Sequence, residues 1–261
     1  MKTPLTLRPA LLHAALLCLL GTSGIGCNPL GVTSAPSRAI PRFEPGGIRV
    51  LFIGNSLTYY NDLGDMMAAV ARSGGDNAIR SATVAFPDYA LEDHIGNGTA
   101  TRALREGNWE FVVLQQGPSS LPANQLLLAD GARSFDRDIR AAGAVPVLFM
   151  VWPQSNRLAD FPAVRTSYRN AAAAVRGIFA PAGDAWAAAW ELDPSTSLYL
   201  DGLHANPAGT YLAAIVILHQ LRGTDPRSLP RKIPGYPASE ATVELLQLAA
   251  RRAIDRNPRW P

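Results

Sequence analysis

The stretch of sequence that decides the fold reads LFIGNSLTYYNDL and runs from residue 51 to residue 63. Its first three residues are apolar and predict the end of a buried strand, whereas its last residues predict the start of a helix. A small polar turn, Gly54-Asn55-Ser56, lies between the two. Because Asn61 or Asp62 is expected to cap the helix that follows, Ser56 is not needed as a cap and is free to act as a nucleophile.

Short apolar runs alternate with helical segments from this stretch to the end of the chain. We expect strands at residues 48–53, 78–85, 109–115 and 145–152, and a short strand within 178–186. We expect helices at 62–74, 99–107, 124–143, 161–178, 206–223 and about 238–256. The strand runs are apolar on both faces, which is typical of a parallel sheet covered on both sides. The sequence therefore predicts an α/β fold, a flavodoxin-like three-layer α/β/α sandwich with a central parallel sheet of about five strands.

The flavodoxin-like strand order places two separate turns side by side. In such sheets the first strand lies beside the third, and ligands bind beyond the carboxyl ends of the strands where the order reverses. The first predicted strand leads into the turn that holds Ser56, and the third ends near Gln115-Gln116-Gly117. The topology therefore predicts that Ser56 and Gln116 lie close together.

The first 27 residues resemble an export signal. Lys2 and Arg8 precede an apolar run at residues 10–20, and small residues follow up to Cys27. A cysteine at that point resembles a bacterial lipoprotein cleavage site, and ordinary signal cleavage is the alternative. Residues 28–47 hold several prolines and are expected to form a linker to a domain at 48–261 that includes the C-terminal helix. The expected location is the periplasm or outer surface as a lipid-anchored protein, or else secretion.

The composition limits the possible partners. The formal net charge of +3 includes Lys2 and Arg8 of the signal, so little excess positive charge remains for nucleic acid. Both cysteines, Cys18 and Cys27, also fall in the signal, so the domain is expected to fold without disulfides or a cysteine nucleophile. No cluster of side chains has the spacing of metal ligands, and no phosphate-binding loop is recognisable. We therefore expect no metal and no cofactor, contact with a membrane only through the lipid anchor, and a monomer.

A second polar motif lies shortly before the helix at 206–223. In LYLDGLHANPAGTY, Asp201 precedes His204 by three residues. An aspartate at this spacing can fold back onto the imidazole Nδ1–H, which fixes the tautomer and leaves Nε2 free as a base. A serine hydroxyl needs such a base to become a nucleophile at neutral pH. Taken alone, the motif is weak, and a structural loop is the more common interpretation.

Together the two motifs resemble those of the SGNH/GDSL-type hydrolases. GNSLT at 54–58 resembles the family's first block, with Asn for the more usual Asp, and DGLHANPAGTYLAA at 201–214 resembles its last block. VVLQQGPSS at 112–120 lacks the usual Gly-x-Asn-Asp; it resembles instead the Gln-Gly-Glu motif of sialate and acetylxylan-type esterases. It also resembles an uncharacterised bacterial branch of the superfamily.

The resemblance implies a role for each matching residue. Ser56 would attack an ester carbonyl, His204 would accept and return the proton, and Asp201 would orient His204. The oxyanion would be held by the Ser56 backbone N–H and by the Gln116 side-chain amide, with Gln115 as the alternative. The loop at 85–94 lacks the glycine that the family places there, although a backbone N–H near residues 88–90 remains a candidate.

Three further residues are expected to contact substrate, namely Asn55, Tyr89 and Trp152. Two hypotheses follow. The first is an exported serine hydrolase that cleaves carboxylic esters, including O-acetyl groups on glycans, through a Ser-His-Asp triad. The second is a catalytically weak or inactive carbohydrate-binding module on the same fold, favoured by the missing glycine and asparagine.

Overall fold

The computed structural model describes residue 43 and residues 46–258. All of these residues fall within one unit of the chain, Val32–Pro261. The predicted export signal at 1–27, the predicted lipidation site Cys27 and most of the predicted linker at 28–47 lie outside the described residues. These interpretations therefore stay predictions.

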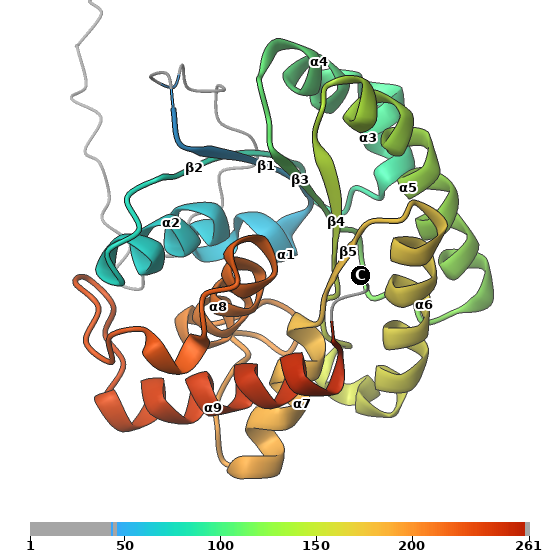
Figure 1. Ribbon diagram of the computed structural model, residues 1–261. Coiled ribbons are helices and arrows are strands. Elements are labelled where there is room, and N and C mark those ends of the chain that lie inside the picture. Colours follow the sequence, from blue (N-terminus) through green and yellow to red (C-terminus); the bar gives the residue numbers. More distant parts are fainter. Residues whose placement is uncertain (1–42, 44–45, 259–261) are drawn as a thin grey trace, which may run out of the picture. The chain divides into compact units, whose positions relative to one another are not determined.

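Five strands of the described chain pair in parallel in one sheet (Figure 1). They are β1 (Ile48–Gly54), β2 (Ile79–Ala85), β3 (Phe111–Leu114), β4 (Val145–Phe149) and β5 (Ile178–Ala180). Their order across the sheet is β2-β1-β3-β4-β5. The order reverses between β1 and β3, which is the flavodoxin-like switch point. The predicted α/β fold with a parallel sheet of about five strands is confirmed.

Helices cover both faces of the sheet (Figure 1). One layer contains α3 (Leu91–Asn97), α4 (Thr99–Glu106), α5 (Pro122–Ala141) and α6 (Phe161–Ala174). The other contains α2 (Leu63–Ser73), α7 (Ala182–Leu192), α8 (Pro207–Arg222) and α9 (Glu240–Arg256). Four short turns of helix join these elements: α1 (Ser56–Tyr59), η1 (Tyr60–Asp62), η2 (Ser155–Asp160) and η3 (Pro226–Ser228).

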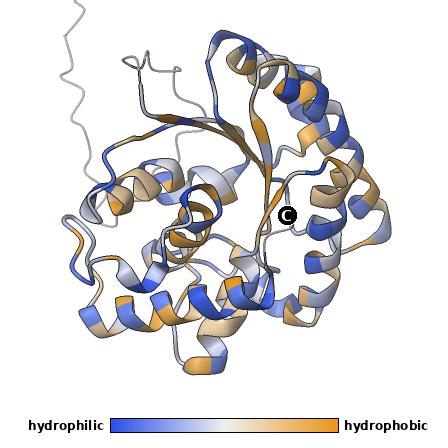
Figure 2. Ribbon diagram, viewed as in Figure 1, coloured by the Kyte–Doolittle hydropathy of each residue, from blue (hydrophilic) through white to orange (hydrophobic). Residues whose placement is uncertain are grey.

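Helix α8 is the element that fixes the second half of the site. Asn206 caps it by accepting a hydrogen bond from the Gly209 N–H at 3.0 Å, and Pro207 occupies its first turn. The helix is buried along most of its length because α2, α7 and α9 surround it, which agrees with its apolar sequence. The loop that holds Asp201 and His204 therefore ends on one of the best anchored helices of the domain. Figure 2 shows hydrophobic residues over much of the central strands and both kinds of residue along the helices.

The long elements begin and end within a few residues of the predicted positions. Helix α7, whose sequence is AGDAWAAAWEL, was not predicted. It lacks an extended polar face because α8 and α9 pack against it, so no amphipathic period marks it. Within residues 46–258, no helix has both the length and the apolar character that crossing a bilayer would need.

Asp62 occupies the N-cap position of α2, as predicted, but its side chain does not cap the helix. Asn61 and Asp62 both have positive φ, and Asp62 makes no side-chain capping bond to α2. The Asn61 amide instead donates to the Ala205 carbonyl and to Thr210 Oγ1, each at 2.9 Å. Asn61 therefore ties the segment after Ser56 to the start of α8, a long-range contact that no local pattern could indicate.

Candidate active site

The turn at the end of β1 is shaped by Asn55 and Gly54. Asn55 caps α1, since its Oδ1 accepts from the Leu57 N–H at 3.1 Å, and Ser56 is then the first residue of that helix. A Cβ at Gly54 would collide with the side chains of Gln115 and Thr58, so only glycine fits at this position. Ser56 is therefore not the cap of α1, as predicted. The residue that takes the capping role in its place is Asn55, not Asn61 or Asp62.

The Gln115 side chain holds this turn from the neighbouring strand. Its Oε1 accepts from the Asn55 N–H at 2.9 Å and from Thr58 Oγ1 at 2.7 Å. Its Nε2 donates to Asn55 Oδ1 at 2.9 Å and to the Gln116 carbonyl at 2.6 Å. Gln115 is fully buried, so each polar atom of its amide is paired within the protein. It is a brace of the turn rather than a donor to substrate.

The structure brings together the three residues predicted as a triad. Ser56 Oγ lies 2.9 Å from His204 Nε2, and His204 Nδ1 lies 2.7 Å from Asp201 Oδ2. Ser56 is buried except for 8% of its surface. In this geometry the imidazole can accept the serine proton at Nε2 while Nδ1–H remains hydrogen bonded to the carboxylate.

The loop before α8 presents Asp201 to the imidazole. Asp201 Oδ1 accepts from the backbone N–H groups of Leu203 at 3.0 Å and His204 at 2.8 Å, which leaves Oδ2 for the ring. Burial raises the pKa of the Asp201 carboxyl, but hydrogen bonds from the His204 ring and from the two backbone N–H groups outweigh it. The net pKa is lowered, so Asp201 is a carboxylate at neutral pH.

Tyr60 lies flat against the imidazole. The rings of Tyr60 and His204 are stacked with centroids 3.9 Å apart and planes 8° apart. This contact restricts rotation of the imidazole, and the face of the phenol ring attracts the positive charge that the imidazole gains when it takes up a proton. Tyr60 directly follows α1, so the same turn positions both Ser56 and the aromatic support of its partner.

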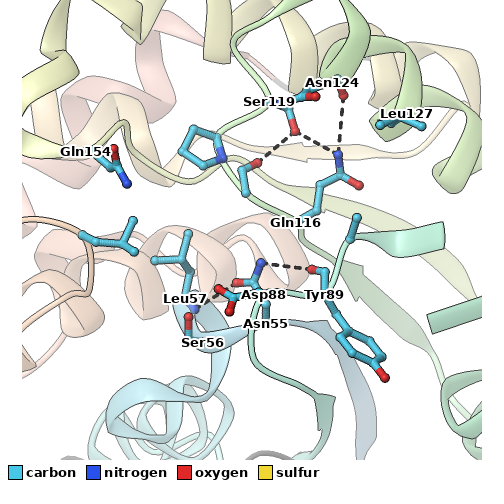
Figure 3. Close-up of a pocket in the computed structure, with 14 residues that line it drawn as sticks. Asn55, Ser56, Leu57, Asp88, Tyr89, Gln116, Ser119, Asn124, Leu127 and Gln154 are labelled. Atoms are coloured by element: carbon cyan, nitrogen blue, oxygen red, sulfur yellow. Dashed lines mark hydrogen bonds between the residues drawn. The ribbon is translucent and has the colours of Figure 1, made fainter. Parts of the chain in front are cut away.

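A cavity of about 320 Å³ opens beside Ser56 (Figure 3). Its lining comes from the turn after β1, the loops after β2 and β3, the start of α5, the segment after β4 and the loop before α8. The lining residues are Asn55, Ser56, Leu57, Asp88, Tyr89, Ala90, Gln116, Gly117, Pro118, Ser119, Asn124, Leu127, Gln154 and Leu203. The cavity therefore lies at the carboxyl end of the sheet next to the switch point, where the topology predicted it.

Gln116 lines this cavity, but its amide does not face Ser56. Its Nε2 donates to Ser119 Oγ at 2.9 Å and to the Asn124 carbonyl at 3.5 Å, and its Oε1 accepts from the Leu91 N–H at 3.2 Å. Figure 3 shows the amide nitrogen turned toward Ser119 and away from Ser56. The predicted oxyanion role of Gln116 is therefore not supported by this arrangement.

Residues 88–90 line the cavity together with Ser56, so their backbone N–H groups are the next candidates for an oxyanion donor. Tyr89 N–H bonds to the Phe86 carbonyl and Ala90 N–H bonds to Asp93 Oδ2. Asp88 lines the cavity with φ of 59°, a backbone conformation more usual for glycine. Asp88 therefore allows this backbone turn without the glycine that the resemblance implies. Its N–H is the candidate oxyanion donor that remains in the loop at 85–94.

Of the three residues predicted to contact substrate, two line the cavity and one does not. Asn55 and Tyr89 line the cavity, but the Asn55 amide is held by the turn and donates to the Tyr89 carbonyl at 3.1 Å. The Tyr89 ring packs edge-on against His94. Trp152 does not line the cavity, which corrects its predicted role: it is 1% exposed and stacks on Trp186 with centroids 3.6 Å apart.

His94 contacts the turn after β1 at Gly54 and takes no part in the triad. It is fully buried, and its Nε2 donates to the Gly54 carbonyl at 2.8 Å. Its Nδ1 has no hydrogen-bond partner among the described residues. Burial lowers the pKa of His94, so the neutral ring is the stable form in the folded protein. Elsewhere among the described residues, no three His, Cys, Asp or Glu side chains are arranged to hold a metal ion.

The fold and this site define an SGNH-like α/β protein, and solved structures bear out the resemblance at the level of the fold. The chain is similar to a protein from Slackia heliotrinireducens whose name assigns it to the SGNH hydrolases, with a TM-score of 0.56 and 26% identity over 67% of this chain and 99% of that one. It is also similar to a DUF4886 family protein from Bacteroides uniformis, with a TM-score of 0.61 and 19% identity over 80% and 95% of the two chains.

A third similar structure is an acetylxylan esterase from Geobacillus stearothermophilus, with a TM-score of 0.52 and 13% identity over 68% of this chain and 95% of that one. At this identity the likeness concerns the fold alone. A scan against models of protein families gave no match, and a search of curated proteins gave none either.

The stacked tyrosine gives a first prediction. Tyr60→Leu is expected to lower kcat for 4-nitrophenyl acetate by about three- to tenfold with little change in KM, because a cation–aromatic contact contributes about 0.5–1 kcal/mol or more. Tyr60→Phe keeps the ring and is expected to stay within about twofold of the wild type. Equal losses in the two variants would assign the effect to the hydroxyl and contradict the stacking argument.

His94 gives a prediction about stability. Its pKa in the folded protein is below the unfolded value of about 6.5, so its contribution is present above that pH and is lost as the pH falls through the folded pKa. The free energy of unfolding in urea is expected to fall between pH 7.5 and pH 5.5, by at most about 1.4 kcal/mol per pH unit from this residue. His94→Gln is expected to flatten that dependence, and an unchanged slope would contradict the assignment.

Proposed function

We propose that this protein is an exported serine hydrolase that cleaves carboxylic esters. The observation that carries the proposal is the line of contacts from Ser56 Oγ to His204 Nε2 at 2.9 Å and from His204 Nδ1 to Asp201 Oδ2 at 2.7 Å. A cavity opens on the serine, as a substrate requires. The SGNH-like fold, shared with a solved SGNH hydrolase and a solved acetylxylan esterase, supports the proposal.

The proposed reaction has two halves. His204 Nε2 takes the proton of Ser56 as Oγ attacks the ester carbonyl, and the tetrahedral intermediate collapses when His204 returns that proton to the leaving alcohol. Water then attacks the acyl carbonyl as His204 takes its proton. The second tetrahedral intermediate collapses when His204 gives that proton to Ser56 Oγ, which releases the acid and restores the free serine. Asp201 holds the imidazole in the required tautomer and stabilises its charged form.

The proposed oxyanion hole uses backbone groups. Ser56 is the first residue of α1, so its N–H has no intrahelical acceptor and is available beside the nucleophile. The Asp88 N–H, from the loop across the cavity, is the proposed second donor. Removal of one side-chain donor from the oxyanion hole of another hydrolase costs about 2.7–4 kcal/mol, which sets the scale for each donor here.

The proposed substrates are esters of hydroxyl-rich alcohols, in particular O-acetyl groups on glycans. The cavity is lined by amides, a carboxylate and hydroxyls as well as leucines, and a structurally similar protein is an acetylxylan esterase. An export signal with lipidation at Cys27 would place such an enzyme in the cell envelope, where we propose it acts as a monomer.

A second candidate is a glycan-binding module with weak or no catalysis. Gln116 Nε2 is committed to Ser119 and Asn124, so the site lacks the side-chain donor that the resemblance implies. If backbone donors alone stabilise the oxyanion poorly, the same cavity would bind an ester and turn it over slowly.

The two candidates are separated by the rate of hydrolysis of 4-nitrophenyl acetate. The wild type is expected to turn over, and Ser56→Ala and His204→Ala are each expected to lower kcat by about 10³-fold or more, because the triad acts as a unit. Ser134→Ala serves as the control, because Ser134 is exposed on α5. Thermal unfolding checks that each variant folds. Full activity in Ser56→Ala would reject the proposed nucleophile.

A further inference from the structure

A second, smaller cavity adjoins the one beside Ser56. It has a volume of about 140 Å³, and four residues line both cavities, namely Pro118, Ser119, Asn124 and Gln154. The remaining lining comes from the loop before α5, from the segment after β4 and from η2. The two spaces are therefore neighbouring parts of one depression at the carboxyl end of the sheet.

One wall of the smaller cavity is formed by a segment that is hydrogen bonded to the His204 loop. The segment after β4, which lines it through Pro153 and Gln154, is bonded to that loop at both ends. The Ser155 N–H donates to the Gly202 carbonyl at 2.8 Å, and Trp152 Nε1 donates to the Leu203 carbonyl at 2.9 Å. The buried Trp152 therefore has a structural role, since it bonds the His204 loop to the wall of this cavity.

The proposed reaction dictates what must lie on this side. His204 Nε2 returns its proton to the oxygen of the leaving alcohol, so that oxygen has to face His204 while the carbonyl oxygen faces the backbone donors of Ser56 and Asp88. The alcohol portion of the ester therefore extends along the His204 side. Gln154 lines both cavities and stands next to Ser155, which is bonded to the His204 loop, so the smaller cavity is the neighbouring space open to the alcohol.

We propose that the smaller cavity is a subsite for the alcohol portion of the ester, and that it selects an uncharged alcohol carrying several hydroxyl groups. The inference rests on the proposed esterase function. It adds a place for the alcohol and the residues that recognise it.

The polar wall of the subsite is a small network on η2 and the preceding loop. Arg157 pairs with Asp160 at 2.6 Å, and Ser120 Oγ donates to Asp160 Oδ2 at 2.9 Å. Both charged side chains stay partly exposed, at 45% and 28%. A guanidinium has five N–H donors and a carboxylate about four acceptor positions, so this network leaves donors and acceptors for the hydroxyls of a ligand.

The charge and the remaining lining define the class of alcohol. The positive and negative charges of the pair cancel, so the wall favours neither an anionic nor a cationic alcohol. A fatty alcohol would remove water from the pair without replacing its hydrogen bonds, which is unfavourable. Pro118, Pro153 and the half-exposed Leu121 offer apolar contact to carbon atoms. A sugar ring, with hydroxyls on its edge and C–H groups on its faces, satisfies both kinds of wall.

The test compares two acetates of equal ring size. Methyl xyloside carrying one O-acetyl group and cyclohexyl acetate differ mainly in the hydroxyls and ring oxygen of the alcohol. The wild type is expected to hydrolyse the sugar ester with a kcat/KM at least about tenfold higher, the effect of one hydrogen bond to a charged group. Equal values for the two esters would overturn the subsite. Failure to hydrolyse either ester or 4-nitrophenyl acetate would instead reject the esterase function on which it rests.

Arg157→Ala and Asp160→Ala assign the selectivity to residues. Each is expected to reduce the ratio of the two kcat/KM values by about tenfold, toward one. Arg133→Ala is the matched control, because Arg133 and Asp130 form an ion pair of the same sequence spacing on α5 at 2.7 Å and line neither cavity. A ratio unchanged in the Arg157 and Asp160 variants, or reduced equally in the control, would overturn the assignment.

Discussion

The amide of Gln115 is the interaction on which the rest of the site depends. Gln115 directly follows β3, and its amide pairs with the backbone and side chain of Asn55 and with the hydroxyl of Thr58. The end of β3 therefore holds the turn that follows β1. Buried amides of this kind contribute most when all their atoms are paired, because any unpaired polar atom there costs about 1–3 kcal/mol. The flavodoxin-like strand order makes this contact possible, since it places the end of β3 beside the turn that follows β1.

The turn then organises the two halves of the triad. With Asn55 fixed, Ser56 begins α1, and Tyr60 directly after that helix stacks on the His204 ring. From the other side, α8 anchors the loop that carries Asp201 and His204, and Asn61 joins the two sides through its bonds to Ala205 and Thr210. Ser56 and His204 come from segments 148 residues apart, yet each is held by contacts within its own segment and by a few long-range bonds.

Local pattern and motif were sufficient for the fold and for the residues that make the triad geometry. Strand runs apolar on both faces indicated the parallel sheet, and the two motifs indicated Ser56, Asp201 and His204. The sequence could not separate the two adjacent glutamines: alternation along a strand sends Gln115 and Gln116 to opposite sides but does not say which side faces the serine. The role of Trp152 was predicted wrongly and helix α7 was not predicted. In both cases the surroundings are helices and aromatic rings distant in sequence, which a local pattern does not reveal.

The central claim is that the braced turn makes Ser56 a nucleophile, and labelling with a fluorophosphonate probe followed by peptide mapping tests it most directly, before any natural substrate is known. The account predicts that one serine is labelled, that it is Ser56, and that prior unfolding in urea abolishes the labelling because reactivity comes from the folded geometry. Labelling of a different serine, or no labelling of the folded protein, would contradict the account.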